Sequence, residues 1–143
     1  MSPNQNAPNG GSCSEIQLDF QECQQILQRA PEGICKSSPE GTFLFVNPAF
    51  ARMFGYPSPA EMIESVSDIA GQLYVDSEDR YNVQYLLQNQ GEVLNYECPM
   101  LRKDGSQFWT SFSAETVRDW DGHALHYVAF MSEITGCRQA EKR

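Results

Sequence analysis

Hydrophobic residues first recur at a regular spacing after residue 14. Residues 1–14 are rich in Asn, Pro, Gly and Ser, a composition that predicts a disordered tail. Residues 15–30 carry an apolar side chain every three or four positions, which predicts one apolar face on an amphipathic helix. Because an isolated helix of this length is marginal in water, we expect this face to pack against another surface. Its apolar positions are Ile16, Phe20, Cys23, Leu27 and Ala30.

The next two apolar segments, residues 34–38 and 42–47, predict short strands. The residues between them, Ser-Pro-Glu-Gly at 38–41, have the composition of a tight turn, with Pro early and Gly last. The two strands are therefore expected to form a hairpin.

Helical signals occupy the middle of the chain. Asn47 can cap a helix that has Pro48 at its first position, where the missing N–H is harmless. A second short helix is predicted over 58–64, followed by short helical turns and loop over 65–75. A longer helix over 76–90 starts with acidic residues and stops at a glycine.

The last third of the chain predicts three strands, at 93–101, 106–118 and 124–134. They are separated by two turns that each contain Asp-Gly, at 102–105 and 119–122, a strong hairpin signal. The order of two strands, several helices and three strands predicts an α+β fold. Its antiparallel sheet would carry the helices on one face.

The charge and composition of the chain argue against some classes of binding partner. Ten Lys and Arg stand against nineteen Asp and Glu in 143 residues, giving a net charge of −9. Such a surface repels phosphate backbones and anionic lipid, so we expect no nucleic-acid partner and no membrane insertion. The start of the chain has no export signal and the five cysteines are widely spaced. We therefore expect reduced thiols and a cytoplasmic location.

Several short motifs occur in a characteristic order. They are Glu40-Gly41, Asn47-x-Ala49 through Gly55-Tyr56, Ser77-Glu78-Asp79-Arg80, Arg102-Lys103-Asp104-Gly105-Ser106, Asp121-Gly122 and Glu133-Ile134-Thr135. In this order and at this spacing they resemble the PAS domain over residues 31–136. The family usually ends in Asp-Ile-Thr, so Glu133 is a conservative departure from its pattern.

The resemblance implies a five-stranded antiparallel sheet in the order 2-1-5-4-3 with helices over one face. It also implies a cytosolic input module of a multidomain signalling protein. Many such modules hold a small molecule or cofactor between helices and sheet. Their output domains include histidine kinases and cyclic di-GMP enzymes. Residues 137–143 would begin the exit linker towards a covalently attached output domain.

The family register suggests which side chains face the helices and form a candidate pocket. Two interpretations stay open: a filled core, or a partly open apolar pocket with a polar side chain that orients a small ligand. Tyr96, Thr110 and Tyr127 are the candidates for that polar contact. The full candidate set is Phe50, Met53, Phe54, Tyr96, Phe108, Thr110, Phe112, Tyr127, Ala129 and Met131.

Two cofactor types of the family are disfavoured. Light-sensing flavin members carry a reactive Cys in an Asn-Cys-Arg-Phe-Leu stretch, which this chain lacks. They also carry a Gln on the last strand, where this chain has Met131. Oxygen-sensing haem members use a His on the long helix, and residues 76–90 contain none. No cofactor is predicted, although non-covalent flavin and haem held by Met or Cys stay open.

No catalytic residue and no metal site are predicted. The sequence has no Walker A motif and no G-x-S-x-G or H-E-x-x-H motif, so we expect enzymatic output only elsewhere in a longer protein. His123 and His126 are three apart, so on a strand they would point to opposite faces and could not share a metal.

The outer face of the sheet is expected to be apolar as well, through Trp109, Val128 and Phe130. The apolar seam of the N-terminal helix, Ile16, Phe20, Cys23 and Leu27, would cover this face. The sheet it covers belongs either to the same chain or to the second copy of a homodimer.

Signal output is expected at the end of the last strand. Glu133 is predicted to pair with Lys36 on the adjacent first strand, next to Ile134 and Thr135 at the exit. The leading interpretation is thus a sensory and dimerisation module. The alternatives are a ligand-free interaction domain and a flavin or haem redox or gas sensor.

Overall fold

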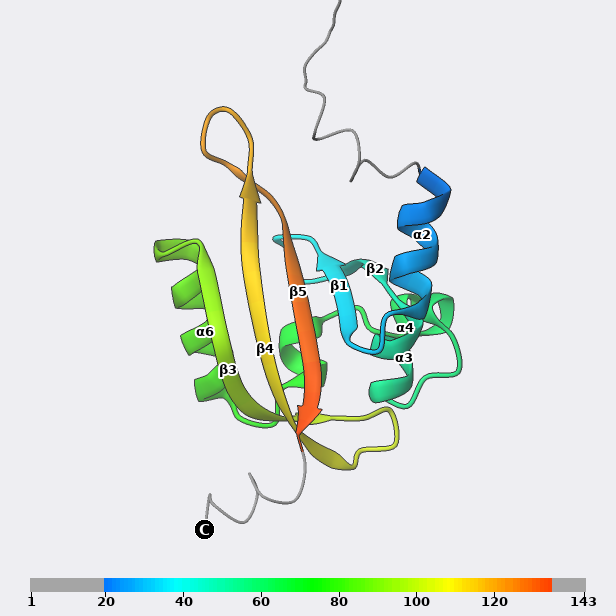
Figure 1. The fold of residues 1–143 in the computed structure, drawn as a ribbon. Helices are drawn as coiled ribbons and strands as arrows, with labels where there is room; N and C mark the ends of the chain where they lie inside the picture. The colour runs from blue at the N-terminus through cyan, green and yellow to red at the C-terminus, as the bar shows by residue number, and fades with distance from the viewer. Residues whose placement is uncertain (1–19, 135–143) are drawn as a thin grey trace, which may run out of the picture.

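The computed structural model describes residues 20–134, drawn in colour in Figure 1. The predicted tail at 1–14, Ile16, Thr135 and the exit linker at 137–143 lie outside the described residues, as does the side chain of Phe20.

Five strands form one antiparallel sheet in the order β2-β1-β5-β4-β3, as predicted. Each strand begins and ends within one residue of its predicted bounds, because turns with Gly41, Gly105 and Gly122 at positive φ separate the hairpin strands. The strands are β1 (Gly33–Ser37), β2 (Phe43–Val46), β3 (Glu92–Leu101), β4 (Gln107–Arg118) and β5 (Ala124–Ile134).

The pairing of β1 with β5 joins the N-terminal hairpin to the C-terminal strands. It runs antiparallel from Gly33 opposite Met131 to Ser37 opposite Tyr127. The two strands are far apart in sequence but adjacent in the sheet (Figure 1). The segment between the hairpins must therefore leave the sheet and return to it.

That segment forms four helices, and Figure 1 shows them on one side of the sheet. No helix within residues 20–134 is long and apolar enough to cross a membrane. The helices are α2 (Phe20–Arg29) before the sheet, and α3 (Pro48–Met53), α4 (Pro59–Ser65), α5 (Ile69–Leu73) and α6 (Ser77–Asn89) between β2 and β3.

Side-chain caps explain where the helices begin. Asn47 accepts a hydrogen bond from the Phe50 N–H, Ser58 from the Glu61 N–H and Asp76 from the Glu78 N–H. Gly91, at positive φ, follows the end of α6. The long helix was predicted at 76–90 and is observed one residue shorter at each end.

The core lies between the helices and the inner face of the sheet. The inner side chains of β4 that were predicted from alternation are all buried. A row of aromatic rings runs through this core. Phe50 lies 5.5 Å from Phe43 and 4.9 Å from Phe54, which in turn contacts Phe108 at 5.0 Å. The row connects β2 through α3 to β4.

Asn47 ties three elements together from a fully buried position, at 0% exposure. Its Oδ1 accepts hydrogen bonds from the N–H groups of Ile34 and Phe50, each at 2.9 Å. Its Nδ2 donates to the carbonyl oxygens of Leu27 at 3.0 Å and Glu32 at 3.1 Å. The amide thus links α2, β1 and α3, and both of its N–H donors are used.

The described part of α2 packs against α3 at one end of the helical layer. Cys23 is exposed, Ile26 is 54% exposed and Leu27 is partly buried. The helix therefore presents apolar side chains to solvent. The outer face of its own sheet also stays open, because Phe130 is 45% exposed.

Asn47→Ala is expected to lower the free energy of unfolding by about 2–4 kcal/mol, because it leaves two buried N–H groups and two carbonyl groups without partners. Chemical denaturation of the 143-residue chain measures this. Asn89→Ala is the matched control, since that amide makes one exposed hydrogen bond to the Tyr85 carbonyl. It should change stability by less than about 0.5 kcal/mol. Equal losses in the two variants would contradict the role given to Asn47.

Candidate ligand-binding site

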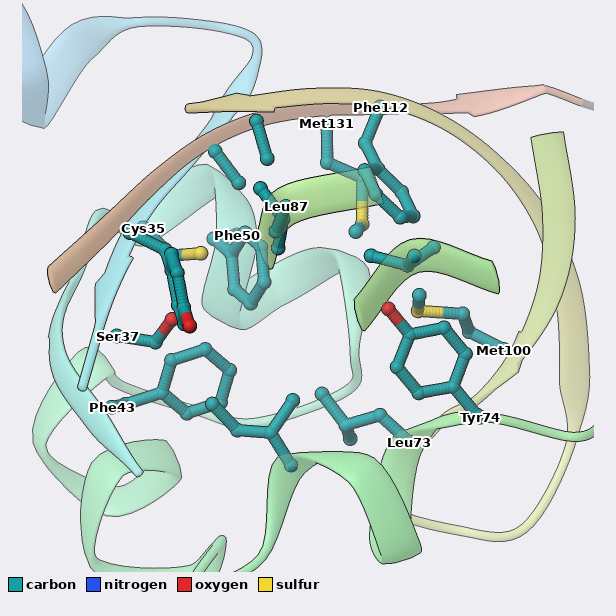
Figure 2. A pocket seen from close by; sticks show the side chains of 15 residues that line it. Cys35, Ser37, Phe43, Phe50, Leu73, Tyr74, Leu87, Met100, Phe112 and Met131 are labelled. Carbon is teal, nitrogen blue, oxygen red and sulfur yellow. The ribbon is translucent and has the colours of Figure 1, made fainter. Parts of the chain in front are cut away.

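An apolar cavity of about 90 Å³ lies between the sheet and the helices. Its lining comes from all five strands and from α3, α5 and α6. Figure 2 shows Phe43, Leu73 and Tyr74 on one side of this space and Met131 and Phe112 on the opposite side. The cavity is thus a feature of the whole domain.

Small side chains on neighbouring strands create this space. Ala114 on β4 lies opposite Ala129 on β5, and Ala129 lies opposite Cys35 on β1. All three line the cavity. These three short side chains project little from the sheet, and the helices that face them do not fill the space that results.

Five of the ten predicted pocket residues line the cavity. They come from three elements, one from α3, one from β4 and three from β5. These residues are Phe50, Phe112, Tyr127, Ala129 and Met131.

Phe54, Phe108 and Thr110 were predicted to line the pocket and do not. All three are buried, Phe108 and Thr110 near the start of β4 and Phe54 at the end of α3, and the rings of Phe54 and Phe108 are in contact. The Thr110 hydroxyl donates to the Cys98 carbonyl at 2.9 Å and has no free side towards a ligand. Alternation gave the correct face of the strand, but one end of that face is filled.

Met53 and Tyr96 also lie outside the cavity lining. Met53 packs against the core at the end of α3. The Tyr96 hydroxyl donates to Asp79 at 2.8 Å and accepts from the Asn82 side chain at 3.2 Å, so it fastens α6 to β3. Burial, together with the Asp79 carboxylate, raises the pKa of Tyr96 to about 12.

The prediction missed the helical wall of the cavity. Ile69 and Leu73 on α5 and Val83 and Leu87 on α6 all line it. Each pair is four residues apart, the spacing that places two side chains on one helix face. This spacing was the available signal, and it was weak in the segment 65–75 because α5 has only five residues.

The Cys35 thiol and the Tyr74 hydroxyl at the cavity are neutral at physiological pH. Burial raises the pKa of the Cys35 thiol to about 12, so the reactive thiolate is absent. Burial also raises the pKa of the Tyr74 hydroxyl, with smaller contributions from nearby groups such as Cys98. The cavity can therefore enclose an apolar group, and it offers no nucleophile.

A flavin or a haem does not fit these residues. The cavity of about 90 Å³ is well below the roughly 300 Å³ at which pockets for drug-sized ligands begin. Cys35, Met100 and Met131 supply sulfur atoms to the lining, but the space beside them holds only a small group.

A groove of about 120 Å³ continues from the cavity towards the surface. The two spaces share lining residues on β1, β5, α5 and α6, among them Ser37, Tyr74 and Tyr127. The groove extends to the turn of the first hairpin and to Arg80 and Gln84 on α6. The apolar cavity thus has a more polar entrance.

Glu133 pairs with Arg102 at 2.7 Å, and the predicted pairing with Lys36 is wrong. Lys36 lies opposite Val128, five residues before Glu133 on β5, so the strand register separates them. The Arg102 guanidinium also lies 4.4 Å from the centre of the Phe108 ring. Ile134 lies opposite Trp109 at the exit of the sheet.

The turn beside Arg102 also contacts the helices. The Lys103 N–H donates to the Phe54 carbonyl at 2.8 Å, and the Lys103 ammonium pairs with Glu61 on α4 at 2.9 Å. The end of β5 is therefore connected to the helical layer through one turn.

The outer face of the sheet contains a second hollow of about 250 Å³. Leu94, 67% exposed, lines it together with Val128 and Phe130, and so do Glu92 and Glu115. Trp109 is partly buried on the same face. The residues predicted for this face are therefore accessible at least in part.

The turn between β4 and β5 brings Asp119, Asp121 and His123 together, with ligand atoms within 4.8 Å of one another. One oxygen of Asp119 accepts hydrogen bonds from the backbone N–H groups of Asp121 and His123. The cluster thus closes the turn, and His126 is not part of it.

Comparison with known proteins agrees with this architecture. The family model described as "PAS domain" matches residues 31–136. A PAS domain from Colwellia psychrerythraea superimposes with a TM-score of 0.68 at 19% identity, covering 81% of this chain and 97% of that one. A PAS domain from a two-component sensor histidine kinase gives 0.65 at 18% identity, covering 87% and 100%.

An RNA-binding light-oxygen-voltage receptor gives a TM-score of 0.67 at 24% identity, covering 80% of this chain and 33% of that one. At these identities the solved structures are evidence of a shared fold alone. The family model covers most of the chain, and its residues form the sheet and helices described above. The chain therefore belongs to the PAS domain family, whose members are sensory modules of signalling proteins.

Proposed function

We propose that this chain is the cytoplasmic sensory input module of a multidomain signalling protein, and that it binds a small molecule in the cavity between sheet and helices. The observation that carries the proposal is the apolar cavity of about 90 Å³ lined by all five strands. The output domain would be a histidine kinase or a cyclic di-GMP enzyme attached to the exit linker.

The energetic cost of an empty cavity supports a ligand. Side chains that line this unfilled apolar space lack packing partners on that side, even though the space opens into the groove. A larger residue in place of Ala129 or Ala114 would restore part of these contacts. A ligand that fills the cavity recovers the missing contacts and stabilises the folded state.

The route to the output domain is proposed to run through Arg102 and Glu133. Phe50 lines the cavity and contacts Phe54, which contacts Phe108. Arg102 lies on the Phe108 ring and holds Glu133 at the end of β5. A ligand that moves Phe50 would thereby shift the exit at Glu133, Ile134 and Thr135.

A thermal-shift screen of small metabolites tests the cavity directly. We expect at least one compound to raise the unfolding midpoint of the 143-residue chain, by an amount equivalent to about 2.7 kcal/mol at one hundred times its Kd. Ala129→Leu places three further carbons in the cavity and should abolish this shift.

The output route has its own test by NMR spectroscopy. Amide resonances of Glu133 and Ile134 should move on binding in the wild type and stay in place in Arg102→Gln.

Ala51→Leu is the matched control for Ala129→Leu, since Ala51 is fully buried where the core is full. It should lower stability by about 1–3 kcal/mol through overpacking, whereas Ala129→Leu should be nearly neutral. Equal destabilisation by the two substitutions, or a compound that stabilises Ala129→Leu as well as the wild type, would refute the cavity as the binding site.

We also propose that two copies associate through the outer sheet face. Leu94 and Phe130 are exposed there, and α2 presents Cys23 and Ile26 to solvent. The exposed Cys23 and Ile26 side chains of α2 from one copy would occupy the hollow beside Val128 of the other. Both apolar surfaces belong to the same chain, so a second copy supplies the complementary surface for each.

Sedimentation analysis of the 143-residue chain tests this association. We expect a dimer for the wild type and at least a tenfold weaker association for Leu94→Ser, which loses buried apolar area at the interface. Leu125→Ser is the control, because Leu125 is also exposed but alternates to the other face of β5. A monomeric wild type, or equal weakening by both substitutions, would show that the outer face is no dimer interface.

A further inference from the structure

The groove at the entrance to the cavity is lined by an arginine, whereas the cavity itself has no charged side chain among its described lining residues. Arg80, on α6, lines the groove together with Gln84, and the inner cavity begins one helical turn further on, at Val83. Among residues 20–134 no carboxylate lines either space, although the chain carries nineteen Asp and Glu. The charged residue that the described lining contains is therefore positive, in a protein of net charge −9.

The Arg80 guanidinium has capacity for a further partner. Within the described residues it donates one hydrogen bond, to the Tyr81 hydroxyl at 3.3 Å, and lies 4.9 Å from the centre of that ring. It forms no ion pair with any described carboxylate. Asp79, its acidic neighbour in sequence, accepts the hydrogen bond of Tyr96 and does not line the groove. A guanidinium has five N–H donors, so most of them are available.

The two spaces suit the two ends of one amphipathic molecule. The inner cavity is lined by rings and aliphatic side chains such as Phe50, Leu73 and Met131, which favour an apolar chain. An anionic group cannot enter there without losing its hydration, whereas beside Arg80 it stays partly solvated and gains charge-assisted hydrogen bonds.

The spacing along α6 sets the length of such a molecule. Val83 and Leu87 line both spaces and lie three and seven residues after Arg80. At 1.5 Å per residue this is about 5–10 Å along the helix axis, which suits a chain of roughly four to eight carbons.

We infer that the ligand of this site is a short-chain aliphatic carboxylate, with its carboxylate at Arg80 and its chain in the inner cavity. The inference rests on the proposed function, because it identifies the ligand class of the same cavity. The hydroxyls of Ser37 and Tyr127, which line both spaces, stand where the polar and apolar parts of the ligand meet.

Hexanoate and hexan-1-ol form a matched pair of probes, since they share the chain and differ in charge. Calorimetric titration of the 143-residue chain should show hexanoate binding about tenfold more tightly than hexan-1-ol, the factor expected of a charge-assisted hydrogen bond. Arg80→Gln should remove this preference and leave the affinity for hexan-1-ol unchanged. Arg52 is an exposed arginine of α3 outside the groove. Arg52→Gln removes the same charge, and this variant should keep the preference for hexanoate.

The outcomes separate the ligand class from the cavity proposal. Both probes could bind equally well, unaffected by Arg80→Gln, and lose all binding in Ala129→Leu. This result would overturn carboxylate recognition, and the cavity would still be a binding site. Loss of the preference in both arginine variants would show a general effect of net charge and overturn the role of Arg80. If neither probe binds at millimolar concentration while a screened metabolite binds, the short-chain carboxylate is the wrong ligand class.

Discussion

The structure depends on the pairing of β1 with β5. This contact joins a hairpin from the start of the domain to a three-stranded unit from its end, with Gly33 opposite Met131 and Ser37 opposite Tyr127. Once both hairpins lie in one layer, the segment between Val46 and Glu92 has to fold over one face of the sheet. Asn47 stabilises this arrangement, because its buried amide holds β1, α3 and the end of α2 in fixed positions.

The cavity exists because the side chains that face the helices differ in size along the sheet. Large rings fill the core near the start of β4, where Phe54 and Phe108 are in contact. Towards the other end, Cys35, Ala129 and Ala114 form a row of small side chains across three strands. The short helix α5 and one face of α6 close this region without filling it. The turn at Arg102 contacts both the helical layer and the end of β5, so the proposed binding site and the proposed output exit are connected through it.

The helices and strands could be predicted well from the sequence because capping residues and turn residues mark where they begin and end. Asn47, Ser58 and Asp76 cap helices through their own side chains, and Asp-Gly turns separate the last three strands. The order of the strands in the sheet came from the family resemblance, because local patterns do not specify which distant strands pair.

The candidate site was predicted only in part, for a physical reason. Alternation identifies the face of a strand, but it does not say where along that face the core is full. Phe112 and Phe108 therefore looked alike in sequence, although only Phe112 lines the cavity. The partner of Glu133 was missed because Arg102 lies in a turn 31 residues away and reaches it only in the folded sheet.

A crystal structure of the chain under xenon pressure would reveal both the order of the strands and the cavity, since xenon enters preformed apolar cavities. We expect the strand order 2-1-5-4-3 with a xenon site bounded by Leu73, Met100 and Ala129. A sheet whose two hairpins lie in separate layers, or a core between sheet and helices that takes up no xenon, would contradict this expectation.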